Sequence, residues 1–80
     1  MIGIPNTHSI YSIADWVEFY VIYENKTLSK STMLALLQAN DGNLKEEDID
    51  SVLGEMIRRK NLYGNSVPFE VDGRSIKPKI

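Results

Sequence analysis

The fold is decided by residues 43–76, NLKEEDIDSVLGEMIRRKNLYGNSVPFEVDGRSI. In this stretch a helical pattern leads directly into a hairpin pattern. Asn43 is the expected N-cap of the helix, with Glu46 three residues later as in a capping box. Apolar residues recur at helical spacing on one face: Ile49, Val52, Leu53, Met56 and Ile57. Basic residues 58–60 suit the negative end of a helix dipole, so we expect this helix to span roughly residues 44–60.

A β-hairpin is predicted over residues 69–76, with Asp72-Gly73 as a two-residue type I′ turn. In that register Phe69 faces Ile76 across the two strands. Alternation along the strands then gathers three apolar residues on the face toward the helices: Phe69, Val71 and Ile76. Leu62-Tyr63 is interpreted as a candidate for one further short strand.

Two more helices are predicted upstream. The first is expected to begin at Ser12, with Asp15 completing a capping box, and to end at Asn25-Lys26. Its apolar stripe has helical spacing: Ile13, Trp16, Val17, Tyr20 and Val21. The second helix is expected to be capped by Ser29 and to end at Asn40-Asp41-Gly42, where the glycine suits a left-handed cap.

These elements predict an α+β fold of three helices with a small C-terminal antiparallel β-hairpin. We interpret residues 1–11 as an N-terminal arm, 12–76 as the domain, and 77–80 as a basic tail or the start of a linker. A chain of 80 residues allows one domain with a modest core. We expect these side chains to be buried together: Trp16, Leu37, Leu53 and Ile57, with Phe69 and Ile76 closing the sheet side.

Composition narrows the classes of function. The net charge is −2, so the basic footprint usual in nucleic-acid-binding proteins is lacking. There is no cysteine, which excludes disulfide frameworks and zinc–thiolate sites. The first residues do not resemble a signal peptide, and no apolar run has the length of a membrane span. We therefore expect a cytoplasmic protein without metal, cofactor or membrane partner.

Three helices followed by a hairpin, joined through Arg58-Arg59-Lys60-Asn61-Leu62-Tyr63-Gly64, resemble the winged helix-turn-helix superfamily over about Ile13 to Ile76. The resemblance implies that the third helix enters the DNA major groove and that the hairpin, or wing, contacts the DNA backbone or minor groove. It also implies a second role, because some members have lost DNA binding and act as protein-interaction or positioning domains.

The start of the third helix has the wrong charge for DNA. Four carboxylates lie in its first two turns, offset locally only by Lys45: Glu46, Glu47, Asp48 and Asp50. Phosphates repel such a cluster unless it is neutralised. The acids suit the positive end of the helix dipole and a solvated face, and Glu47 and Asp50 are also candidates for contact with a protein partner.

Basic residues lie at the other end of the same helix and in the hairpin. In the DNA-binding alternative, five of them would contact phosphates: Arg58, Arg59, Lys60, Arg74 and Lys77. We favour the simpler interpretation of these residues as partners of the helix dipole and a solvated tail.

The first helix has more apolar surface than one core face requires. Phe19, Ile22 and Tyr23 follow a second side of it, where they either complete the core beneath the arm or form an association surface. Aromatic residues are enriched at protein interfaces, so these three are our main candidates for a partner-binding site.

The sequence therefore predicts a non-catalytic accessory module of winged-helix type, for protein–protein interaction, self-association or positioning within a larger protein or assembly. Duplex DNA binding is the alternative. We do not expect an enzyme, because no metal cluster, phosphate-binding loop or catalytic triad spacing is visible, and the single histidine, His8, has no arranged partner in sequence.

Overall fold

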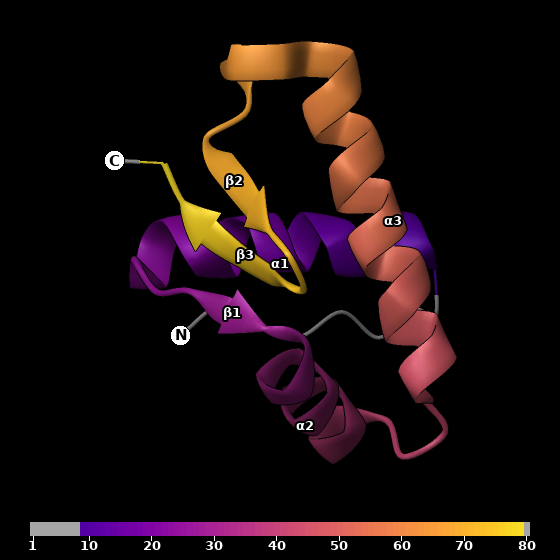
Figure 1. Ribbon diagram of the computed structural model, residues 1–80. Helices are drawn as coiled ribbons and strands as arrows, with labels where there is room; N and C mark the ends of the chain where they lie inside the picture. The colour runs from indigo at the N-terminus through magenta and orange to yellow at the C-terminus, as the bar shows by residue number, and fades with distance from the viewer. Residues whose placement is uncertain (1–8, 80) are drawn as a thin grey trace.

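The computed structural model describes residues 9–79, which form three helices and a three-stranded antiparallel sheet (Figure 1). The helices are α1 (Ile10–Glu24), α2 (Lys30–Asn40) and α3 (Glu46–Tyr63), followed by the short 3₁₀ helix η1 (Gly64–Ser66). The strands are β1 (Leu28–Ser29), β2 (Phe69–Asp72) and β3 (Ser75–Pro78). The predicted α+β class with a C-terminal hairpin is confirmed.

The sheet has the order β1-β3-β2, so the last strand lies between the other two. Strand β1 was not predicted, because Leu28 and Ser29 form only one pair of bridges, with Ile76 and Ser75. The same two residues also begin α2, since the Ser29 hydroxyl accepts a hydrogen bond from the Thr32 amide at 3.3 Å. Sequence patterns for strands need longer runs than this.

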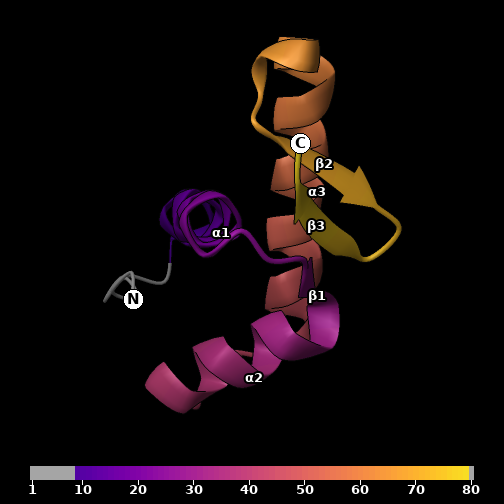
Figure 2. The same cartoon turned by 90° about the vertical axis from the view of Figure 1, so that its left-hand side faces the viewer.

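The core lies where α1 and α3 pack against each other and against one face of the sheet, with α2 closing one end (Figures 1 and 2). Of the six predicted core residues, five are buried: Trp16, Leu37, Leu53, Phe69 and Ile76. Ile57 is the exception, with 43% of its surface exposed. It lies at the edge of the apolar stripe of α3, beyond the line through Ile49, Val52 and Met56, all of which are buried.

Of the three predicted helix starts, that of α2 after Ser29 is confirmed, and the other two were wrong by two or more residues. Helix α1 begins at Ile10 rather than Ser12, because the carboxylate of Asp15 binds Arg59 of α3 instead of closing a capping box. Helix α3 begins at Glu46, where the Asp48 carboxylate accepts from the Lys45 amide at 2.8 Å.

Three further details near helix ends differ from expectation. Asn43 belongs to a turn rather than to a cap, since its amide donates to Asp41 Oδ1 at 3.0 Å. Gly42 is not the left-handed cap of α2: the residue after that helix, Asp41, has extended backbone. Leu62-Tyr63 is not a strand but the last part of α3, which ends at Tyr63 with Gly64 as its C-cap.

The hairpin register also differs from the predicted one. Val71 pairs with Ile76 and Asp72 with Ser75, so the turn residues are Gly73 and Arg74. A type I′ turn over Asp72-Gly73 would need positive φ at both residues, whereas of these two only Gly73 has it, at 61°. A glycine at the first central position is typical of a type II′ turn. The shift moves each partner by two residues, so the same side chains still face the helices.

The predicted terminal segments are partly revised. Residues 1–8 of the proposed arm and Ile80 of the proposed tail lie outside the described residues. Ile10 and Tyr11, assigned to the arm, are the first two residues of α1. Lys77 and Pro78, assigned to the tail, belong to β3.

Candidate functional site

A groove of about 630 Å³ runs along the outside of the contact between α1 and the C-terminal half of α3. The link from η1 to β2 forms its remaining side. Eleven residues line it: Tyr11, Asp15, Glu18 and Phe19 from α1; Glu55, Arg58, Arg59 and Tyr63 from α3; and Ser66, Val67 and Pro68 from the link.

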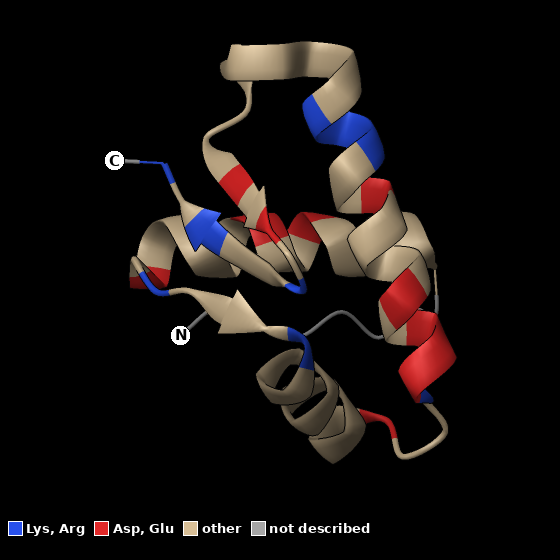
Figure 3. Ribbon diagram, in the orientation of Figure 1, with Lys and Arg blue, Asp and Glu red and all other residues tan. Residues whose placement is uncertain are grey.

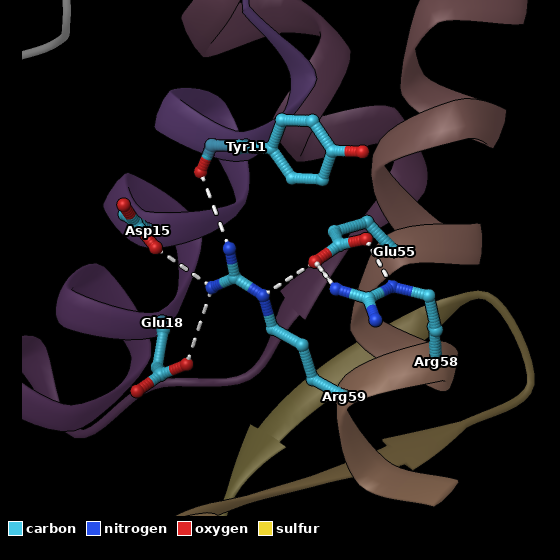
Figure 4. A network of polar contacts seen from close by, with 6 residues as sticks. All are labelled: Tyr11, Asp15, Glu18, Glu55, Arg58 and Arg59. Carbon is cyan, nitrogen blue, oxygen red and sulfur yellow. Dashed lines mark hydrogen bonds and ion pairs between the residues drawn. The ribbon is translucent and has the colours of Figure 1, made fainter. Parts of the chain in front are cut away.

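A carboxylate held between two arginines forms the α3 wall of this groove (Figure 4). Glu55 is only 7% exposed, and it accepts hydrogen bonds from Arg58 Nε and Nη2 at 2.8 and 2.9 Å. Arg59 Nε donates to the second carboxylate oxygen at 2.7 Å. The hydrogen bonds from Arg58, reinforced by those from Arg59 against the effect of burial, lower the pKa of Glu55 to about 2. Glu55 is therefore ionised at neutral pH and is a poor general base.

Arg59 joins the two walls, because its side chain reaches across from α3 to α1 (Figure 4). Its Nη1 lies 2.8 Å from Asp15 Oδ1 and 3.6 Å from Glu18 Oε1, and its Nη2 donates to the Tyr11 carbonyl at 3.4 Å. Burial lowers the pKa of Arg59, but its hydrogen bonds to Glu55 and Asp15 outweigh that effect and raise it overall. Arg59 therefore fixes α1 relative to α3, and its guanidinium group is already bound by acceptors of its own chain.

Aromatic rings form the rim of the groove and remain in solvent. Tyr11, Phe19 and Tyr63 are 62%, 50% and 58% exposed. Phe19 is stacked on Tyr23, which is 71% exposed, with ring centroids 5.7 Å apart and an interplanar angle of 17°. Three rings therefore line the groove, and Tyr23 extends their exposed apolar surface through its stacking on Phe19.

The predicted partner-binding residues are only partly brought together. Phe19 is exposed at the groove and stacks on the exposed Tyr23, whereas Ile22, also on α1, is half-buried and does not line the groove. Glu47 and Asp50 lie at the opposite end of α3, away from the groove, and both are exposed.

The acidic start of α3 is partly neutralised by a lysine of α2. Lys30 Nζ lies 2.6 Å from Asp50 Oδ1 and 3.3 Å from Glu46 Oε1, and its side chain is only 11% exposed. The hydrogen bond to Asp50 raises the pKa of Lys30 above its usual value despite its burial. A second recess of about 340 Å³ lies here, lined in part by Lys30, Leu34 and Arg74.

The five basic residues proposed for DNA contact are distributed over the last turns of α3, the hairpin turn and β3 (Figure 3). Arg58 and Arg59 belong to the groove network, and Lys60 is half-buried in the last turn of α3. Arg74 is exposed in the hairpin turn, while Lys77 of β3 lies 3.7 and 3.9 Å from carboxylates of its own hairpin.

Of the residues that line the groove, sequence reasoning proposed only Phe19, Arg58 and Arg59 for a site. Tyr11 was assigned to the arm, Asp15 to a capping box and Tyr63 to a strand, and Glu55 was not considered. For Glu55 a signal was present: Arg58 and Arg59 follow it at the i+3 and i+4 spacing that places ion pairs on one helix face. Its pairing with α1 had no local signal, since Asp15 and Arg59 are 44 residues apart.

The charged groups of the groove are engaged with each other. Residues 9–79 contain no cluster of three or more acidic, histidine or cysteine side chains placed to hold a metal ion. No helix in the same part of the chain is long and apolar enough to cross a membrane. Comparison with known proteins found no matching family model, no matching curated protein and no matching solved structure.

Proposed function

We propose that this chain is a non-catalytic module of winged-helix type that binds a protein partner at the groove between α1 and α3, and so positions a larger protein or assembly. The order helix, strand, two helices and hairpin supports the winged-helix part of the proposal, together with a last strand that returns beside the first.

The observation that carries the proposal is the exposure of three aromatic rings that line the groove, Tyr11, Phe19 and Tyr63. Tyr23, stacked on Phe19, is exposed as well. An aromatic side chain buries about 150–250 Å² when it is fully covered. A partner that covers these exposed rings would therefore gain a favourable free energy of binding from burial of apolar surface. The groove wall beneath them is held by Arg59, which favours binding with little rearrangement of the backbone.

Charge placement favours protein over duplex DNA. The first turns of α3, which would approach base edges in a winged-helix protein, carry Glu46, Glu47 and Asp48. Arg59 is only 15% exposed and is held by Asp15 and Glu55, so binding phosphate at Arg59 would require those ion pairs to be replaced.

The chain contains no cysteine, which permits a direct test by single-cysteine protection. Phe19→Cys places a thiol at the groove, and Ala35→Cys places one at an exposed position of α2. We expect both thiols to react with a maleimide at similar rates in the purified chain at low concentration. In cells that produce the protein, we expect the thiol at position 19 to be protected several-fold and the control to stay reactive. Equal reactivity of the two thiols in cells would overturn the proposal.

Duplex DNA binding is tested separately by fluorescence anisotropy at about 0.15 M salt. Non-specific binders have a Kd of about 10⁻⁴–10⁻⁶ M, and we expect this domain at the weak end of that range or beyond it. Submicromolar binding that is lost when Arg58, Arg59 and Arg74 are changed would make the domain a DNA-binding module instead.

A further inference from the structure

We propose that the partner in the groove is a second copy of this chain, and that the two copies form a symmetric dimer with the α1 wall of each against the α3 wall of the other. This inference rests on the proposed function and identifies the protein that binds in the groove. It depends on how charge is divided between the two walls and on the area of the aromatic rim.

The two walls of the groove carry opposite charge. The α1 wall contributes two carboxylates, Asp15 and Glu18, and the α3 wall contributes one carboxylate, Glu55, and two guanidinium groups. At the surface the contrast is sharpest between Asp15 and Arg58, whose side chains are 60% and 57% exposed. A partner of a single sign would therefore be repelled by one of the walls.

A second copy of the chain can place its positively charged α3 wall against the acidic α1 wall and its acidic α1 wall against the α3 wall. In a two-fold symmetric interface residue i of one copy contacts residue j of the other, and j contacts i. With the two-fold axis along the groove, Asp15 of each copy faces Arg58 of the other. The charge pattern is thus self-complementary, which gives a symmetric dimer two equivalent ion pairs at the edges of the aromatic contact.

The aromatic rim supplies the apolar centre of such an interface. The three rings that line the groove, Tyr11, Phe19 and Tyr63, and Tyr23, which stacks on Phe19, are each at least half exposed. This corresponds to about 100 Å² of exposed surface per ring. Together the four rings supply about half of the roughly 800 Å² that each partner buries in a standard interface. The charged groups and the link from η1 to β2 line the same groove and would supply polar contacts beside the rings.

Sedimentation velocity of the purified chain, from about 1 µM to 1 mM, tests self-association directly. We expect the weight-average mass to rise with concentration from that of a monomer toward that of a dimer. Phe19→Glu should weaken dimerisation at least tenfold, because it places a charge among the rings. Ala35→Glu, which adds the same charge to an exposed residue of α2, should leave dimerisation unchanged.

A charge swap tests the reciprocal contact. Asp15→Lys and Arg58→Glu each bring like charges together across the interface, so either variant alone should dimerise about tenfold more weakly than the wild type. An equimolar mixture of the two variants should recover dimerisation as a heterodimer, since each unfavourable pair is then replaced by a favourable one. Thermal melts check that both variants are folded. If either is not, the comparison of Phe19→Glu with Ala35→Glu tests whether dimerisation occurs at the groove.

Two outcomes overturn the inference: a wild-type chain that is monomeric at about 1 mM, or a dimer that is equally strong in Phe19→Glu and Ala35→Glu. A monomeric chain whose position 19 is nevertheless protected in cells would refute self-pairing and leave the proposed protein-binding function standing. A dimer in which the two variants do not complement each other would refute the arrangement of α1 against α3.

Discussion

Two glycines of the α3 region should respond in opposite directions to the same substitution, Gly→Ala. Gly54 lies in the middle of α3, and a Cβ built there has no atom within 4 Å. Gly64 follows the last residue of α3 and has φ 58° and ψ −128°, a backbone conformation that alanine adopts only under strain. Space is open around Gly64 too, so only its backbone distinguishes it from Gly54.

The expected magnitudes follow from these conformations. Gly54→Ala should raise the free energy of unfolding by about 1 kcal/mol, the difference in helix propensity between the two residues. Gly64→Ala should lower it by about 1–2 kcal/mol, the cost of a positive φ in a residue that has a Cβ. For a domain of this size a change of 1 kcal/mol shifts Tm by about 4–8 °C.

Thermal and urea unfolding followed by circular dichroism would measure both variants beside the wild type. A neutral or destabilising Gly54→Ala would mean that α3 is interrupted or closely approached at that position. A neutral Gly64→Ala would mean that the chain does not leave α3 through a left-handed glycine. Either result would refute the reasoning about α3, which forms one wall of the groove.

Further predictions concern the core and the groove network. Leu53→Ala should cost about 2–5 kcal/mol, whereas Ile57→Ala, at a position 43% exposed, should cost less than about 1 kcal/mol in the same unfolding assay. The pKa of Glu55 falls from its ordinary 4.5 to about 2 on folding, so its stabilising contribution is complete above pH 4.5 and is lost as the pH falls toward 2. The difference in Tm between the wild type and Glu55→Gln should therefore shrink over that interval, and a difference independent of pH would contradict the ion pairing.

The sequence predicted the elements that rest on local chemistry. Helical spacing identified the buried face of α3 through Val52, Leu53 and Met56, and Ser29 was correctly assigned as the cap of α2. Predictions were wrong where a side chain could bind either a neighbour in sequence or a residue far along the chain. Asp15 was expected to cap its own helix, but it binds an arginine 44 residues away, and no local pattern contains that contact.

The candidate site was less predictable than the fold. Phe19 and Tyr23 could be found because they fall outside the core stripe of their helix. The groove itself depends on how α1 and α3 cross, so its other aromatic residues, Tyr11 and Tyr63, were assigned to an arm and a strand. The third strand was missed for a related reason: two residues, Leu28-Ser29, become a strand only because β3 lies beside them.

The measurement that tests the central claim most directly is photo-crosslinking in cells that produce the protein. A photoreactive phenylalanine analogue replaces Phe19 at the groove or, in the control, Ala35 on α2. The account predicts a discrete protein adduct from position 19, identified by mass spectrometry as a second copy or another protein, and none from position 35. Adducts of equal yield from both positions, or an adduct to nucleic acid from position 19, would contradict it.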